Sequence, residues 1–144
     1  MFSKTCEYAI KIMIYISSRK EEENMRTGLD EIAEAIDSPK AFTAKILQQL
    51  AKAGILESVR GRSGGFSLPP KKTIALSDVI VAIDGDKLIK RCVLGFRECS
   101  DLTPCPIHHR FKPVRLAMTE TFESTSLEEL KGIMEENKVF LIEP

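Results

Sequence analysis

Residues 38–68 read SPKAFTAKILQQLAKAGILESVRGRSGGFSL, and this stretch decides the fold. Apolar residues recur at helical spacing through its first half, which predicts a helix over residues 39–53. Residues 55–60 and 66–68 then alternate as two short strands, and the glycines in the turn at 61–65 can take positive φ without strain. The stretch therefore predicts a helix followed directly by a β-hairpin.

A shorter helix precedes this one in the sequence. Apolar residues recur at helical spacing over residues 30–36, and Asp37-Ser38-Pro39 then breaks the pattern. Two short helices joined by a tight turn form a helix-turn-helix, and the hairpin after the second helix is a wing. Further upstream, the apolar residues 8–16 predict a buried helix and the polar residues 17–24 a surface turn.

Helices are also predicted downstream of the hairpin. Residues 77–84 form a short helix capped by Ser77, and a cysteine-bearing loop covers residues 87–106. A longer helix follows over residues 106–124, in which Pro113 either produces a kink or marks the true beginning.

The chain ends in a further helix over residues 126–136, opened by a capping-box sequence, and a short apolar tail at residues 139–142. We therefore expect a mainly α-helical protein with a small β-hairpin wing, in which a winged helix-turn-helix is followed by a longer helix. Three parts are expected: the winged helix-turn-helix domain at residues 1–84, the cysteine loop at 85–106, and the long and C-terminal helices at 107–144.

The net charge of the chain is zero, but the charges are unevenly distributed. Between Ser38 and Lys72 there are seven basic residues and one acidic residue, so this segment carries +6 and the remainder −6. Such segregation is typical of a face that binds a polyanion. A solvated basic face would have the same composition, so charge alone leaves both interpretations open.

The sequence shows no signal for a membrane or for secretion. No apolar run approaches the ~18 residues of a membrane span, and the N-terminus lacks a charged region followed by an apolar core. We therefore expect a cytoplasmic protein without a membrane partner. An enzyme is not expected, because the chain has neither a phosphate-binding glycine loop nor a nucleophile elbow, and its two histidines are adjacent.

Three of the four cysteines, Cys92, Cys99 and Cys105, lie on the cysteine loop. Stable disulfides are uncommon in the cytoplasm, so clustered cysteines there indicate metal ligands or redox groups. Soft thiolates suit iron–sulfur clusters and also zinc. Three merely redox-sensitive thiols are the alternative.

Several stretches, taken together, match one known family: residues 7–9, 31–33, 47–55, 58–68, 74–80 and the cysteine loop. The most specific of them is the Arg-Gly-x-x-Gly-Gly-aromatic pattern of the wing. In these stretches the sequence resembles the IscR/NsrR-type (BadM-like) winged-helix family of bacterial iron–sulfur transcription regulators. The resemblance covers nearly the whole chain.

The resemblance implies a homodimer, with the long helix after the cysteine loop packed against its twofold mate, on a pseudo-palindromic double-stranded DNA operator. A dimer of helix-turn-helix units reads half-sites about 34–36 Å apart. Many family members bind an iron–sulfur cluster through three cysteines that correspond to those of this loop. A two-iron cluster is expected rather than a four-iron one, and it can be lost in air. The first cysteine interval is one residue longer here than the five residues of the best-known members.

The fourth cluster ligand has two candidates, which the sequence leaves open. His108 has Cys-x-x-His spacing from Cys105, as in the IscR branch, and is otherwise an ordinary surface residue. Glu7 matches an acidic position that other branches contribute from the opposing subunit, and is otherwise a carboxylate near a helix N-terminus. His109 would point about 100° away from His108, and Cys6 is expected to be a small core residue.

DNA contacts are expected from the start of the second helix of the helix-turn-helix and from the wing. The candidate residues are Ser38, Lys40, Ala41, Thr43, Ala44, Lys45, Arg60, Arg62 and Ser63. Lysines suit phosphates or guanine, Thr43 suits a base edge, and the wing arginines suit phosphates or a minor groove. Gln48 and Gln49 are expected to pack.

The sequence thus predicts a dimeric DNA-binding regulator that senses redox state, nitric oxide or iron through a cluster, and it leaves repression and activation open. The alternative is a metal-free or zinc-bound regulator with thiol-redox sensing.

Overall fold

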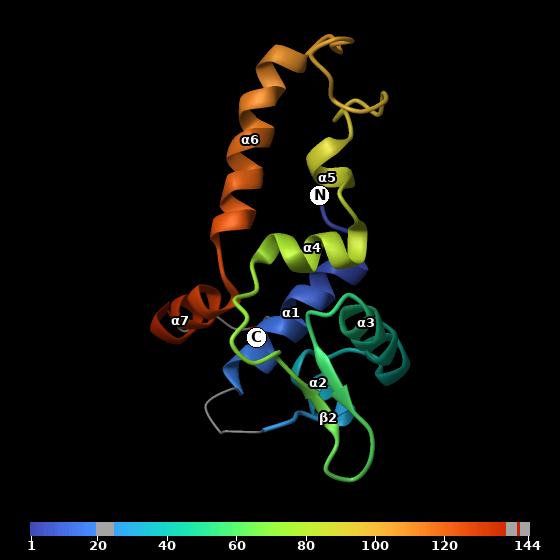
Figure 1. Ribbon diagram of the computed structural model, residues 1–144, viewed down its shortest axis with the longest axis vertical. Coiled ribbons are helices and arrows are strands. Elements are labelled where there is room, and N and C mark those ends of the chain that lie inside the picture. The colour runs from blue at the N-terminus through green and yellow to red at the C-terminus, as the bar shows by residue number, and fades with distance from the viewer. Residues whose placement is uncertain (20–24, 138–140, 142–144) are drawn as a thin grey trace.

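The computed structural model describes residues 1–19, 25–137 and 141. The predicted fold class is confirmed: helices dominate, and one two-stranded antiparallel sheet forms the wing (Figure 1). In chain order the elements are α1 (Lys4–Ser18), α2 (Leu29–Ala35), α3 (Lys40–Lys52), β1 (Glu57–Val59), β2 (Gly65–Ser67), α4 (Leu76–Asp84), α5 (Lys87–Lys90), α6 (His108–Ser124) and α7 (Leu127–Asn137).

Helix α1 lies at the centre of the hydrophobic core, and α2, α3, α4 and α7 pack against it. Its apolar side chains are fully buried at Ile12 and Met13, because the helix is covered on several sides. The predicted surface turn at 17–24 is wrong at its start, since α1 continues through Ser18 and Ser17 is buried. Residues 20–24 of that prediction lie outside the described residues.

The two strands of the wing pair with each other, and Phe66 of β2 also forms an isolated β-bridge with Thr27, which precedes α2. Glu57 pairs with Ser67 across the hairpin, and Thr27 exchanges two backbone hydrogen bonds of 2.9 Å with Phe66. The first strand is shorter than predicted, since Ile55 and Leu56 are buried in the core before β1 begins, and the second has its predicted length but begins one residue earlier, at Gly65. The helix-turn-helix and the hairpin therefore form one packed unit.

Helix α4 does not begin where the sequence pattern placed it. It starts at Leu76, and the carboxylate of Asp78 accepts a hydrogen bond of 2.9 Å from the backbone N–H of Ala75, so Ser77 is not the cap. Ser3, which caps the start of α1, meets the other end of α4, where it donates to the Asp84 carboxylate from both its backbone N–H and its hydroxyl.

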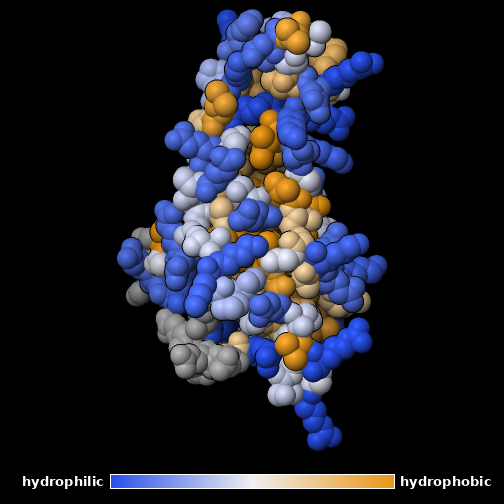
Figure 2. Space-filling view, viewed as in Figure 1, coloured by the Kyte–Doolittle hydropathy of each residue, from blue (hydrophilic) through white to orange (hydrophobic). Residues whose placement is uncertain are grey.

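Helix α6 extends beyond the core as an arm, beside α5 and the cysteine loop (Figure 1). It begins at His108 and runs through Pro113, so the proline lies inside the helix and does not mark its start. Figure 2 shows hydrophobic residues gathered down the middle of one face, between hydrophilic ones. No helix of the described part of the chain is long and apolar enough to cross a membrane.

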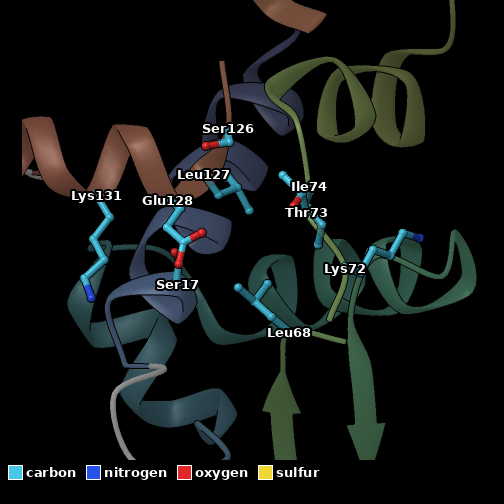
Figure 3. A pocket seen from close by; sticks show the side chains of 9 residues that line it. All are labelled: Ser17, Leu68, Lys72, Thr73, Ile74, Ser126, Leu127, Glu128 and Lys131. Carbon is cyan, nitrogen blue, oxygen red and sulfur yellow. The ribbon is translucent and has the colours of Figure 1, made fainter. Parts of the chain in front are cut away.

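Helix α7 returns to the core after the arm. The backbones at Ala75 and Ser126 form an antiparallel bridge, and the Ser126 hydroxyl accepts a bond of 3.1 Å from the Glu129 N–H, as the capping-box pattern predicts. A small pocket of about 240 Å³ lies at this junction, between the end of α1, the segment after β2 and the start of α7 (Figure 3). Of the predicted tail at 139–142, only Leu141 is described, and it packs against the core.

Candidate DNA-binding face and cysteine pocket

Helix α3 presents a mixed basic and polar surface. Lys40, Ala41 and Lys45 are exposed, Ala44 is half-buried, and the Lys40 amine pairs with the Asp30 carboxylate at 2.5 Å. The predicted residue Ser38, just before the helix, is half-buried. Lys40, Ala41 and Lys45 are therefore open to solvent, as a DNA contact would require.

Thr43 does not face the surface. Its side chain is 0% exposed, and its hydroxyl donates a hydrogen bond of 3.0 Å to the carbonyl of Pro39, one turn earlier. The prediction that Thr43 reads a base edge is therefore wrong. Core packing on Ile46 and Leu47 draws this side of the helix inward.

Gln48 and Gln49 are exposed, so the prediction that they pack is also wrong. Ala41, Lys45 and Gln48 follow at i, i+4 and i+7, which places them on one side of α3. Gln48 thus joins the candidate DNA-reading side, and the helical spacing from Lys45 could have identified it.

The tip of the wing is exposed and basic. Arg60, Arg62 and Ser63 are all exposed, and the guanidinium of Arg26 donates to the Ser63 carbonyl at 3.5 Å. Sequence reasoning missed Arg26, because only the pairing of its neighbour Thr27 with β2 brings it to the wing.

The cysteine loop contains regular structure that the sequence did not predict. After the four-residue helix α5, Arg91 and Glu98 form an antiparallel bridge that closes a small hairpin. The backbone N–H of Cys92 donates to the Arg97 carbonyl at 3.1 Å, and that of Cys99 donates to the Lys90 carbonyl at 2.8 Å. Cys92 and Cys99 therefore lie next to the Arg91–Glu98 pair, one on each strand of the hairpin.

His108 is buried against this hairpin, with 3% of its surface exposed, and is not a surface residue. Its Nδ1 lies 3.3 Å from Cys99 Sγ, and its Nε2 lies 2.8 Å from Asp101 Oδ1. The amine of Lys112 donates to both oxygens of the same carboxylate. Hydrogen bonds from Lys112 and His108 lower the pKa of Asp101 to about 2. The imidazole is thus held between a thiol and a carboxylate that stays ionised.

Cys92 and Cys105 form the other side of the same pocket. Burial acts to raise the pKa of the Cys92 thiol, but backbone hydrogen bonds at Leu94 and Phe96, the Cys105 side chain and the Arg115 charge outweigh it, and the net pKa is lowered. All three thiols and His108 line one cavity of about 350 Å³. Among the described residues, however, no three His, Cys, Asp or Glu side chains are drawn close enough together to hold a metal ion.

The remaining candidates lie elsewhere. Glu7 is an exposed residue of α1 that pairs with Lys4 at 3.2 Å and does not line the cysteine pocket. Cys6 is fully buried, and burial together with the Asp84 charge raises the pKa of its thiol to about 12. His109 is exposed, with its ring edge-on to that of His108.

A helix-turn-helix whose second helix is followed by a basic wing defines a winged-helix DNA-binding protein. The chain belongs to the Rrf2 family: the family model described as "Iron-dependent Transcriptional regulator" matches residues 2–132. The resemblance identified from the sequence is thereby confirmed. The protein is a transcription regulator and not an enzyme, and its family implies DNA binding.

Similar proteins agree with this assignment. A protein of Aquifex aeolicus, whose name describes a helix-turn-helix transcriptional regulator, is 30% identical over 141 residues, covering 95% of each chain. The NsrR regulator of Oceanobacillus iheyensis is 25% identical, covering 88% of this chain and 86% of its own.

Solved structures show the same fold. CymR, the global cysteine regulator of B. subtilis, matches with a TM-score of 0.74 at 25% identity, covering 92% of this chain and 97% of its own. IscR of T. potens matches with a TM-score of 0.74 at 21% identity, covering 96% of this chain and 91% of its own.

Proposed function

We propose that this protein is a cytoplasmic homodimer that binds a pseudo-palindromic operator and adjusts its DNA affinity through an iron–sulfur cluster held in the cysteine pocket. Residues 1–84 would bind DNA, residues 85–106 would sense, and residues 107–144 would dimerise. The observation that carries the proposal is the convergence of Cys92, Cys99, Cys105 and His108 on one cavity.

The donor set fits a cluster in its chemistry, and its four members line one cavity. Three thiols and one imidazole are ligands that iron–sulfur centres use, and here they lie in two contacting pairs, Cys99 with His108 and Cys92 with Cys105. The two pairs would have to approach each other to share one group. His108 is the preferred fourth ligand over Glu7 of the opposing subunit, because it already faces the pocket.

When bound, a cluster supplies a redox-active, oxygen- and nitric-oxide-sensitive centre. The chain itself supplies the coupling. Cys99 and Cys92 lie on the hairpin that follows α5, and His108 is the first residue of α6. Drawing these residues together would fix the hairpin against the arm. An effector shifts DNA affinity only by its differential interaction with two conformations, so loss of these contacts would have to change the spacing of the recognition helices.

A dimer is favoured by the arm. Val114 and Leu116 of α6 expose 54% and 59% of their surfaces, and as i and i+2 they lie on the two flanks of the exposed side of the helix. A second copy of the chain packed across that side would cover them. Two wings and two α3 helices would then face one DNA duplex.

The cluster is tested by anaerobic purification followed by visible spectroscopy and assays of iron, zinc and acid-labile sulfide. We expect broad absorbance at about 400 nm with equal amounts of iron and sulfide. Cys99→Ala should lose iron and the effector response. Cys6→Ala, which removes a buried thiol outside the pocket, should keep both. Retention of iron by Cys99→Ala, or a colourless protein that resists reconstitution, would contradict the proposal.

The second candidate function is thiol-redox sensing without iron, or with zinc in the same pocket. The contact of Cys99 Sγ with His108 Nδ1, with Asp101 behind the imidazole, favours it. In that case DNA affinity would follow thiol oxidants, and the purified protein would contain no iron.

DNA binding is tested by the salt dependence of affinity for an operator selected from random sequences. Arg62→Ala should lower the slope of log affinity against log salt by about one, because one phosphate contact fewer releases fewer counterions. Lys4→Ala removes an exposed charge from the start of α1 and should leave the slope unchanged. Equal slopes for both variants would exclude the wing as a DNA contact.

A further inference from the structure

A second cavity, of about 610 Å³, lies between the start of α1, the end of α4, helix α5 and one side of α6. It is separate from the cysteine pocket, although Cys92 lines both. Phe111, Arg115 and Met118 follow at i, i+4 and i+7 on α6 and form one wall.

Arg115 is the notable residue of this wall. Only 7% of its surface is exposed, yet no carboxylate lies within ion-pair distance of its guanidinium among residues 1–19, 25–137 and 141. Its Nη1 donates to the carbonyls of Leu88 and Ile89 at 3.0 and 2.9 Å, at the end of α5. Its Nε is buried and has no hydrogen-bond partner in the same described part of the chain. The guanidinium carbon also lies 5.4 Å from the centre of the Phe111 ring. The carbonyl groups and the ring stabilise the guanidinium but do not neutralise it, and a buried cation without a counter-ion is costly.

The other charges around the cavity do not provide that counter-ion. Lys87 and Arg91 also line it and add positive charge, and its one lining acid, Asp84, already accepts two hydrogen bonds from Ser3. The remaining wall is largely apolar. The cavity therefore combines a net positive charge with a hydrophobic surface.

We propose that this cavity binds a small amphipathic carboxylate, an organic acid with a short apolar chain. Its carboxylate would accept charge-assisted hydrogen bonds from Arg115, near the rim formed by Lys87 and Arg91. Its apolar chain would lie against Phe111 and Met118. This site goes beyond the proposed function and does not rest on it, since it requires neither a cluster nor DNA.

The site can be tested position by position, because two of the five methionines of the chain, Met1 and Met118, line it, and Met118 lies on its α6 wall. The full-length protein, labelled with ¹³C at its methionine methyl groups, is titrated with hexanoate and followed by NMR. The Met118 resonance should shift saturably, whereas those of Met13 in the core and Met134 on α7 should stay in place. Hexanamide, which has the same length but no charge, should bind at least tenfold more weakly.

Variants supply the second arm of the test. Arg115→Met keeps the volume of the side chain and should weaken hexanoate binding at least tenfold, whereas Arg110→Met on the exposed side of the same helix should not. If Arg115→Met does not fold, Lys87→Gln combined with Arg91→Gln should weaken binding in its place.

Absence of a Met118 shift, or equal binding of hexanoate and hexanamide, would overturn the proposal. So would a change of oligomeric state in Arg115→Met without hexanoate binding to the wild type, which would mean that a carboxylate of a second copy fills the cavity. Iron content and DNA affinity are measured separately, so failure here leaves the proposed function standing.

Discussion

Gly64 is the most constrained residue of the wing. A Cβ atom added there would lie 2.1 Å from the Val59 carbonyl oxygen and 2.8 Å from the Arg60 carbonyl carbon, so the hairpin would have to open. Both contacts are backbone atoms, which cannot move aside as the end of a flexible side chain can. The glycine pair in the wing is thus required by close approach of the chain to itself as well as by turn geometry.

We predict that Gly64→Ala lowers the free energy of unfolding by roughly 1–3 kcal/mol, the usual range for a strained backbone position, as measured by urea denaturation. Gly132→Ala is the matched control, because nothing lies within 4 Å of its added Cβ in helix α7. It should raise stability by about 0.5–1 kcal/mol, because alanine is the better helix former. A neutral effect of Gly64→Ala would show that the wing relaxes freely.

Cys6 and Cys99 differ in their surroundings and should differ in reactivity. Burial and the nearby Asp84 carboxylate raise the pKa of the Cys6 thiol to about 12, whereas the Cys99 side chain is partly exposed. Since the thiolate is the reactive form, native protein at pH 8 should be alkylated by iodoacetamide at Cys99 well before Cys6. Peptide mass spectrometry over time measures both rates. Equal rates in folded, metal-free protein would contradict the buried position of Cys6.

At the scale of elements, the apolar pattern of α3 predicted the position of the helix but not which of its polar side chains are buried. Its apolar spacing predicted the helix to within one residue at each end. It could not show that Thr43 is buried, because a threonine hydroxyl can bond to the carbonyl one turn earlier and so enter a core without an unsatisfied group.

This difference gives a prediction for the DNA-reading side of α3. Gln48→Ala should weaken operator binding by roughly 1 kcal/mol or more if its amide contacts a base. Thr43→Val should leave DNA affinity unchanged and cost about 0.5–1.5 kcal/mol of stability, through the lost hydrogen bond. Fluorescence anisotropy with labelled operator and thermal unfolding separate the two effects. The reverse pattern would mean that α3 presents another side to DNA.

Two other features, helix α5 and the burial of His108, could not be predicted from the sequence, also for local reasons. Helix α5 is four residues long, too short for any periodic pattern. His108 is buried by Asp101 and Cys99, which come from the preceding loop, and its neighbours along the helix carry no sign of that contact. The three cysteines and His108 were predictable as a set. The pairing of Cys99 with His108 and of Cys92 with Cys105 was not.

At the scale of the whole molecule, the core surrounds α1 while α6 reaches away from it with exposed apolar residues (Figure 1). The positive segment at residues 38–72 supplies α3 and the wing, whereas α6 carries three basic and two acidic residues and is close to neutral. DNA binding and assembly would then use differently charged parts of the molecule.

Leu116→Glu should therefore convert the proposed dimer to monomers, because it would bury a carboxylate between two copies of α6. Sedimentation equilibrium measures the change. Operator affinity should fall at least tenfold with it, as the two half-sites lose their linkage. Val81→Glu places the same charge at an apolar residue of α4 that is 45% exposed, and should stay dimeric. A dimer that survives Leu116→Glu would exclude this side of α6 as the interface.

The hairpin closed by Arg91 and Glu98 also bears on how such regulators can vary in evolution. Its backbone hydrogen bonds place Cys92 opposite Arg97 and Cys99 opposite Lys90, so each thiol is held on its own strand next to the Arg91–Glu98 pair, on either side of the turn. Lengthening that turn from five to six residues costs only about 0.2 kcal/mol of loop-closure entropy. Insertions between the first two cysteines are thus nearly neutral, so the interval can drift among descendants of one gene without displacing either thiol.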